Sequence, residues 1–216
     1  MSKSAQENLI DEMTGFQNYD GFLKDLEELA VISTETCEDL SIAMIDIDSF
    51  KKVNDEYGLE VGDKVIRSIA QHIMANTPDT AKLYRYAGDQ FAILLPAAEK
   101  EKAFLIIEKI RESYAVSFEG KPIALNVTIS AGLSCFPHDG TRTADVIRKA
   151  EGALYRAKSG AKNKVCLSRE EKMVTKTSHY TFEQLKRLSD LAKKEGLGEA
   201  VLLREALDDL LKKYDY

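Results

Sequence analysis

Hydrophobic positions follow two spacings along the chain, and each spacing predicts a different kind of element. Short runs of apolar, β-branched residues are typical of buried strands. Apolar residues repeated every three or four positions indicate helices with one buried face. Up to Ser168 the two patterns follow one another in turn, whereas the rest of the chain shows one short β-prone stretch and then two helical segments.

The first 168 residues therefore predict a set of alternating elements. We expect strands at 41–47, 82–86, 91–96, 123–136 and 163–168, and helices at 63–77, 99–116 and 143–158. Thr143 is a candidate N-cap of the last helix. The turn Ala87-Gly88, between two apolar runs, predicts an antiparallel hairpin.

The order β-α-β-β-α-β is the ferredoxin-like pattern of an α+β fold, with the helices on one face of an antiparallel sheet. In that pattern the first strand lies centrally, beside the hairpin. The carboxyl end of strand 41–47 should then lie near the hairpin tip.

After Ser168 the character of the sequence changes. Residues 169–173 are a polar linker, and residues 174–216 contain a β-prone stretch at 174–180 and helices at 182–196 and 198–214. This unit is too short to hold a core alone, so we expect it to dimerise.

Composition narrows the class of protein. The chain has 216 residues and a net charge of -6, which argues against broad nucleic-acid affinity. Its three cysteines are scattered and form no metal-binding spacing, so a reducing cytosol is expected. No apolar run is long enough to span a bilayer, and neither a signal peptide nor a sensory domain is expected before residue 11.

Acidic residues stand where the first strand ends and at the hairpin tip. Asp46 and Asp48 close the strand, and Asp89 follows Gly88. Converging carboxylates repel one another, and a hard cation such as Mg²⁺ relieves that repulsion. Solvated loop acids are the simpler interpretation of any one of them alone.

Further polar residues favour a phosphate-bearing ligand. Asn54 and Asp63 have side chains able to read a guanine edge, although Asp63 is also a candidate N-cap of the helix at 63–77. Lys51 is a candidate phosphate contact. Lys158 and Lys162 suit either a helix C-terminus or a triphosphate.

Four ordered blocks within residues 11 to about 167 resemble the GGDEF domain of diguanylate cyclases. They are "DEMTGFQN", "DIDSFKKVNDEYGLEVGD", "RYAGDQF" and "LYRAKSGAKN". The resemblance implies a nucleotidyl-cyclase fold in which each domain holds one GTP and two domains face each other. The family joins two GTP into cyclic di-GMP with two metals assisting.

The resemblance also implies residue roles. Metal ligands are Asp46, the Ile47 carbonyl and Asp89. Guanine readers are Asn54 and Asp63, and phosphate or substrate contacts are Phe50, Lys51, Lys158 and Lys162. Lys51 and the position of Gln90 belong to the catalytic set, and Arg85 pairs with Asp11.

Departures from the family pattern put catalysis in doubt. Gln90 replaces a glutamate and can neither balance a second cation nor serve as a base. Ala87 replaces a glycine, and its methyl is expected to crowd the ligand or strain the turn at modest cost. Lys162 replaces an arginine, and the family's other usual residues are also absent at Ser49, Leu59, Tyr19 and Asp20. The stretch "PDTA" lacks the R-x-x-D of the product-inhibition site.

The C-terminal unit resembles ribbon-helix-helix proteins of the CopG or Arc type. In that family two chains pair strands into a ribbon that enters a DNA major groove, which would turn Thr175, Thr177 and His179 outward. From Glu170 onward, however, the chain contains 9 basic and 10 acidic residues, a poor electrostatic footprint for DNA. In addition, Thr181-Phe182 replaces the usual Leu-Pro. DNA binding and pure dimerisation are equally favoured.

Three hypotheses follow. The first is a cytoplasmic regulatory protein that binds GTP or a related guanine nucleotide, makes little or no product, and dimerises through a tail that contacts DNA or a protein partner. The second is an active cyclase whose tail enforces pairing. The third is a DNA-binding regulator whose first domain has lost its nucleotide.

Overall fold

The computed structural model describes residues 9–114, 117–118, 121–122, 127–168, 179–195 and 198–214. The chain folds as two compact units, Met1–Glu170 and Glu171–Tyr216, each of which is considered by itself. None of the helices in the described residues is both long enough and apolar enough to cross a bilayer.

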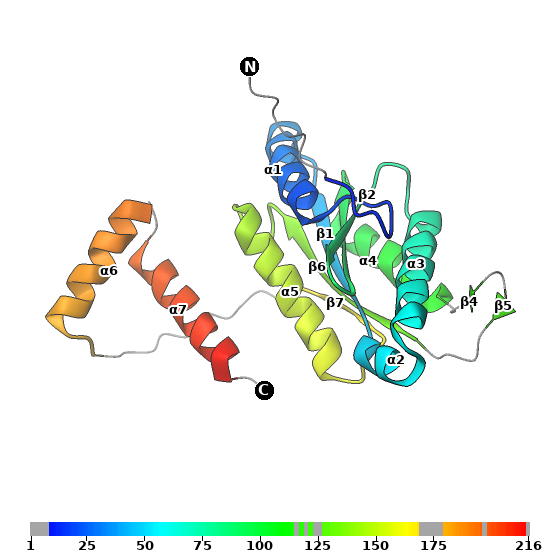
Figure 1. Cartoon of the computed structure of the whole chain (residues 1–216). Coiled ribbons are helices and arrows are strands. Elements are labelled where there is room, and N and C mark those ends of the chain that lie inside the picture. Colours follow the sequence, from blue (N-terminus) through cyan, green and yellow to red (C-terminus); the bar gives the residue numbers. More distant parts are fainter. Residues whose placement is uncertain are drawn as a thin grey trace, which may run out of the picture. The chain divides into compact units, whose positions relative to one another are not determined.

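A five-stranded sheet forms the centre of the first unit (Figure 1). Its strands, in spatial order, are β2 (Lys82–Ala87), β3 (Gln90–Pro96), β1 (Leu40–Ile47), β6 (Ile129–Phe136) and β7 (Val165–Leu167). β1 is antiparallel to both neighbours, and β7 runs parallel to β6. A separate small pair contains β4 (Ser117–Phe118) and β5 (Lys121–Pro122). The expected central position of β1 beside the hairpin is confirmed.

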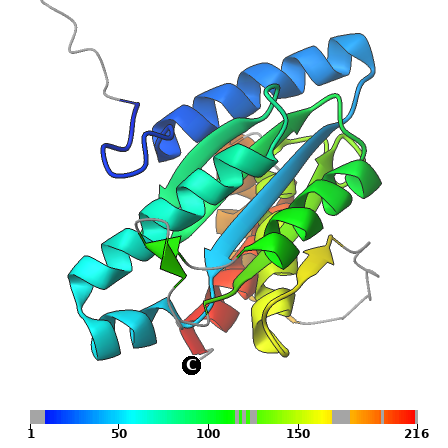
Figure 2. The same cartoon turned by 90° about the vertical axis from the view of Figure 1, so that its right-hand side faces the viewer.

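Helices cover both faces of this sheet. They are α1 (Tyr19–Thr36), α2 (Phe50–Tyr57), α3 (Leu59–Asn76), α4 (Lys100–Ser113) and α5 (Thr143–Ser159). α3 and α4, the helices of the ferredoxin-like pattern, pack on one face as expected and lie on the near side of β1 in Figure 2. The opposite face is covered by α5 and by α1, a helix that the hydrophobic pattern did not predict.

Coverage on both sides explains why β1 reads as an unbroken apolar run. Ala43, Ile45 and Ile47 pack against the layer that contains α3 and α4. Ile42 and Met44 pack against the layer that contains α1 and α5. Because successive side chains of a strand point to opposite faces, every position of β1 is buried.

Three boundaries differ from the predicted ones. α3 begins at Leu59 with Gly58 as its N-cap, so Asp63 lies inside the helix and the prediction that it caps the helix is wrong. Arg142, not Thr143, is the N-cap of α5. The long strand expected at 123–136 starts only at Ile129, and residues 123–126 lie outside the described part of the chain.

The second unit contains α6 (Phe182–Glu195) and α7 (Glu199–Tyr214), as expected. Thr181 begins α6 through a capping box, in which its hydroxyl accepts from the Gln184 amide and Gln184 Oε1 accepts from the Thr181 amide. Thr175 and Thr177 lie outside the described residues, and His179 is exposed and not in a strand.

Candidate functional site

The carboxyl end of β1 meets the tip of the β2–β3 hairpin, as the topology predicted. Asp46 is paired with Gln90 across the β1–β3 ladder and with Ser130 across the β1–β6 ladder. The Ile47 amide donates to the Asp89 carbonyl at 3.4 Å. The sheet register therefore brings Asp46, Ile47 and Asp89, the three residues expected to bind a metal, to one corner of the sheet, the acid corner.

Asp46 is buried, and both of its oxygens have partners within the protein. The ammonium of Lys158, from the last turn of α5, contacts Oδ1. The side-chain amide of Gln90 donates to Oδ2 at 2.9 Å. Gln90 thus acts as a hydrogen-bond donor to Asp46, a contact that the sequence analysis did not foresee.

Asp89 occupies the same corner. Burial raises the pKa of its carboxyl, and the nearby Asp46 carboxylate raises that pKa further. A cation bound between the two acids would remove this repulsion. The donor set of two carboxylates and a backbone carbonyl fits Mg²⁺, which takes few protein ligands and completes its shell with water and phosphate.

The hairpin tip is held in shape by Arg85. Its guanidinium donates to the Gly88 carbonyl at 2.9 and 3.0 Å and forms the expected ion pair with Asp11 at 3.0 Å. Gly88 has a φ of 53°, whereas Ala87 lies outside the positive-φ region. The methyl of Ala87 therefore does not strain the turn, and that part of the expectation is wrong.

Asn54 carries a buried polar atom that lacks a partner. Within the described part of the chain its Oδ1 accepts no hydrogen bond. Gly62 makes this space available, because a Cβ at that position would lie 1.9 Å from the Asn54 oxygen. Buried amide oxygens normally have a donor, and a ligand with a donor at this point would satisfy the atom. Phe50 borders the same space, and Asp63 is half-buried one residue beyond Gly62.

The predicted phosphate-binding lysines are only partly assembled. Lys158 is on Asp46, and Lys162 Nζ donates to Ser49 Oγ at 2.9 Å. Lys51, on the first turn of α2, is exposed. The structure therefore brings Lys158 onto Asp46 and Lys162 onto Ser49, and it leaves Lys51 exposed.

Asp48 is a buried residue of this region to which the sequence analysis gave no role of its own. Its carboxylate accepts from the hydroxyls of Thr128 and Ser130 and from the Asn163 amide. The available signal was the spacing of the two acids in Asp46-Ile47-Asp48, because residues two apart in an extended segment face the same side, although β1 ends at Ile47 and Asp48 lies in the turn that follows.

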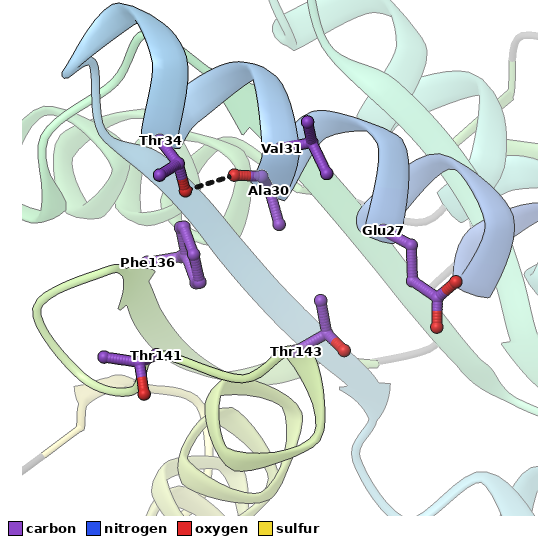
Figure 3. A pocket seen from close by; sticks show the side chains of 7 residues that line it. All are labelled: Glu27, Ala30, Val31, Thr34, Phe136, Thr141 and Thr143. Atoms are coloured by element: carbon purple, nitrogen blue, oxygen red, sulfur yellow. Dashed lines mark hydrogen bonds between the residues drawn. The ribbon is translucent and has the colours of Figure 1, made fainter.

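A shallow hollow of about 350 Å³ lies at the other end of β1 (Figure 3). It is lined by Glu27, Ala30, Val31, Thr34, Phe136, Thr141 and Thr143. Phe136 is paired with Leu40, six residues from Asp46 along the strand, which corresponds to about 20 Å. The hollow is therefore separate from the acid corner.

Comparison with protein families gives two matches. The family model described as "Diguanylate cyclase, GGDEF domain" matches residues 8–164, and the model "Ribbon-helix-helix domain" matches residues 176–215.

Curated relatives match the first unit. Diguanylate cyclase A of Treponema denticola is 37% identical over 149 residues, which are 67% of this chain and 40% of that protein. The response regulator PleD of Caulobacter vibrioides is 30% identical over 172 residues, which are 76% of this chain and 37% of that protein. The chain thus spans less than half the length of these relatives.

Solved structures agree with the sequence matches. The GGDEF domain of PA1120 from Pseudomonas aeruginosa superposes with a TM-score of 0.70 at 28% identity, covering 74% of this chain and 94% of that one. The GGDEF domain of DgcB from Caulobacter crescentus, solved in complex with c-di-GMP, gives a TM-score of 0.69 at 26% identity, covering 78% of this chain and all of that one.

Proposed function

Because the chain belongs to the GGDEF family of diguanylate cyclases and carries a C-terminal ribbon-helix-helix domain, we propose that it is a guanine-nucleotide-binding regulator with little or no cyclase activity. The observation that carries the proposal is the hydrogen bond from the Gln90 amide to Asp46. An N–H group then faces the metal-binding acid where the family places a second negative charge.

Nucleotide binding is supported by what the site retains. The unpartnered Oδ1 of Asn54 accepts from the exocyclic amine of guanine, and Asp63, on the adjoining helix, is the second reader. Lys158 contacts Asp46 at the acid corner and Lys162 contacts Ser49, and a triphosphate would replace these present partners. Phe50 borders the base, and Lys51 is free to reach a phosphate.

Mg²⁺ fits beside the nucleotide, held by Asp46, Asp89 and the carbonyl of Ile47. When bound, it neutralises phosphate charge and polarises the α-phosphate toward attack. Gln90 is neutral, so it balances less of the metal's positive charge than a glutamate at the same position would. It also offers no carboxylate to accept a proton. Binding is therefore expected to survive where turnover does not.

The C-terminal domain supplies dimerisation. Two helices with large exposed apolar side chains cannot bury them alone, and these side chains are Phe182, Leu185, Leu191, Leu207, Leu210 and Leu211. A second copy would cover them, as strand and helix pairing does in ribbon-helix-helix dimers. The near balance of basic and acidic residues in this domain gives it a weak electrostatic footprint for DNA, so DNA contact stays an equal alternative to pure dimerisation, and both use the dimer.

An active cyclase is the second candidate function. It is favoured by the retained convergence of Asp46 and Asp89 at one corner of the sheet, where burial raises the pKa of Asp89 and the Asp46 carboxylate raises it further. In that case the dimeric tail would bring two nucleotide sites face to face.

One experiment separates the two functions. GTP is titrated into the wild-type protein and into Gln90→Glu with Mg²⁺ present, and products are analysed after incubation at high protein concentration. We expect GTP binding without turnover in the wild type and cyclic di-GMP synthesis in the variant. Wild-type synthesis at an ordinary enzyme rate would favour the active cyclase, and absence of GTP binding would overturn both.

A further inference from the structure

The chain leaves β1 through three residues that each contact the end of α5 or the turn after it. Asp46 contacts the ammonium of Lys158. Asp48 Oδ2 accepts from the backbone amide of Asn163 at 2.9 Å, and Ser49 Oγ accepts from Lys162 at 2.9 Å. Of these three contacts, the one made by Asp48 binds a backbone amide, whereas the other two join side chains.

Asp48 is built into the protein as a fixed anion. It is 6% exposed, and it accepts from Thr128 Oγ1 at 2.7 Å and from Ser130 Oγ at 2.8 Å in addition to the Asn163 amide. A buried charge is tolerated only when hydrogen bonds replace its water. These three donors come from two separate parts of the chain, so the carboxylate joins the start of β6 to the turn after α5.

That turn has a backbone conformation that needs support. Lys162 and Asn163 have φ values of 56° and 46°, a region in which a lysine is uncommon. Each such residue costs of order 1 kcal/mol or more, and its conformation persists only where the surroundings hold it. Besides Asp48, Arg111 of α4 donates to the Asn163 side chain at 3.0 Å, and the Ala131 amide donates to the Lys164 carbonyl at 3.0 Å.

We propose that Asp48 is a positioning residue for nucleotide phosphate: by holding the Asn163 amide, it fixes the turn that presents Lys162 to the acid corner. This rests on the proposed function, because Lys162 serves as a phosphate contact only if the site binds a nucleotide. The side-chain contacts of Lys158 and Lys162 can be exchanged for phosphate, whereas the bond from Asp48 to backbone persists with ligand bound.

The test compares Asp48→Ala with a matched control, Thr128→Val. Both remove a hydrogen bond of the same carboxylate, but only the first releases the Asn163 amide. We measure hydrogen exchange of that amide by NMR, and the affinities for GTP and for guanosine by calorimetry.

In Asp48→Ala we expect exchange at Asn163 to accelerate and GTP binding to weaken about tenfold, which corresponds to one charge-assisted hydrogen bond. Guanosine, which lacks phosphates, should bind as it does to the wild type. Thr128→Val should leave exchange at Asn163 and the preference for GTP unchanged.

Equal loss of GTP and guanosine affinity in Asp48→Ala, or unchanged exchange at Asn163, would overturn the positioning role. If the alanine variant does not fold, Asp48→Asn replaces it, because one oxygen remains to accept the amide without the charge. The same selective weakening of GTP is then expected at about threefold, and its absence overturns the role. If the wild type binds no GTP, the proposed function fails, whereas exchange at Asn163 still tests the anchor.

Discussion

Gln90 and Asp46 form a donor–acceptor pair that depends on a single nitrogen atom. A glutamate at position 90 would have the same shape but would present a carboxylate to Asp46, which is already close to Asp89. The structural effect of this residue therefore depends on whether a cation is present.

Gln90→Glu is expected to lower the thermal stability of the protein in EDTA, with a loss of about 1–3 kcal/mol in unfolding free energy. Mg²⁺ should restore most of the loss, since it relieves repulsion among the acids. Thermal unfolding with and without Mg²⁺ measures both effects. Gln90→Met serves as the control, because it loses the hydrogen bond and should show no added dependence on Mg²⁺. Equal stability of Gln90→Glu and the wild type in EDTA would contradict the donor role of Gln90.

Some single-residue placements could be predicted from sequence and others could not. Asp46 and Asp89 were placed together correctly, because strand order and a tight hairpin determine which residues meet. The contact of Lys158 with Asp46 depends on how far α5 extends over the sheet, which local periodicity does not encode. The anchor formed by Asp48 depends on a turn more than a hundred residues away in the chain.

At the scale of elements, the packing of α2 on α3 depends on Gly62. A side chain there would enter the space of Asn54. Gly62→Ala should therefore displace the Asn54 amide and weaken GTP binding at least tenfold, whereas helix content stays unchanged or rises because alanine favours helices. Calorimetry and circular dichroism check the two outcomes.

Gly152→Ala, in the middle of α5, is the matched control for this change. A Cβ there would meet only the Arg156 guanidinium, at 3.8 Å. It should bind GTP like the wild type and gain up to about 1 kcal/mol in stability from helix propensity. Similar losses of binding in both glycine variants would remove Asn54 as the cause.

The loop between β6 and α5 is tied down by Asp139. Burial by itself would raise the pKa of this carboxyl, but hydrogen bonds from Lys100, Ser168 and the Cys135 amide outweigh burial, and the pKa is lowered from its ordinary value of 3.8. Lys100 lies 2.7 Å away and comes from the start of α4. The carboxylate thus links this loop to β6, to the start of α4 and to Ser168, the residue after β7.

A lowered pKa gives a definite dependence on pH. The stabilisation by Asp139 is fully present above its unfolded pKa, near 3.8, and is lost as pH falls through the lower folded value. Asp139→Asn should lose about 2–3 kcal/mol of unfolding free energy at pH 7, and the gap to wild type should close toward pH 3. Asp145→Asn, whose Arg142 partner is half exposed, should lose less than about 1 kcal/mol. A gap that widens in acid would refute the sign.

The sequence analysis did not predict α1, and this helix shows why the hydrophobic repeat alone can miss an element. Its buried face contains Phe22, Leu26 and Ala30, but Asp25 and Ser33 are buried with them. Asp25 accepts from the Tyr84 hydroxyl at 2.7 Å and pairs with Lys82 at 3.1 Å. Ser33 donates to the Glu38 carbonyl, in the connection that follows the helix. These buried polar residues interrupt the apolar repeat, so the hydrophobic pattern alone does not identify the helix.

At the scale of the whole molecule, association is expected to depend on the second unit. Removal of residues 169–216 should convert a dimer into a monomer, because the exposed leucines of α6 and α7 are removed with it. Sedimentation at several concentrations measures the mass. Leu207→Asp should have the same effect in the full chain. Leu105→Asp, on the exposed face of α4, should leave the mass unchanged, and a dimeric truncated chain would show that pairing lies elsewhere.

Of the features of the whole molecule, the division into two units was the easiest to infer from the sequence. A change from alternating strands and helices to one β-prone stretch followed by two helices marks it in the sequence, and the two family models match on the corresponding sides. The β-prone stretch at 174–180, with which the second unit begins, is too short for its pattern to decide between a strand and a connector. A ribbon strand is stabilised only when a second chain pairs with it.

The contact between Lys158 and Asp46 gives the ligand-free protein a built-in competitor for metal. A tethered ammonium is present at a high effective concentration, so a divalent cation arriving alone must displace it and leave it without an anion. A cation that arrives on a triphosphate brings the replacement anion with it. Metal and nucleotide are therefore expected to load as one coupled event, and neither should saturate the site well without the other.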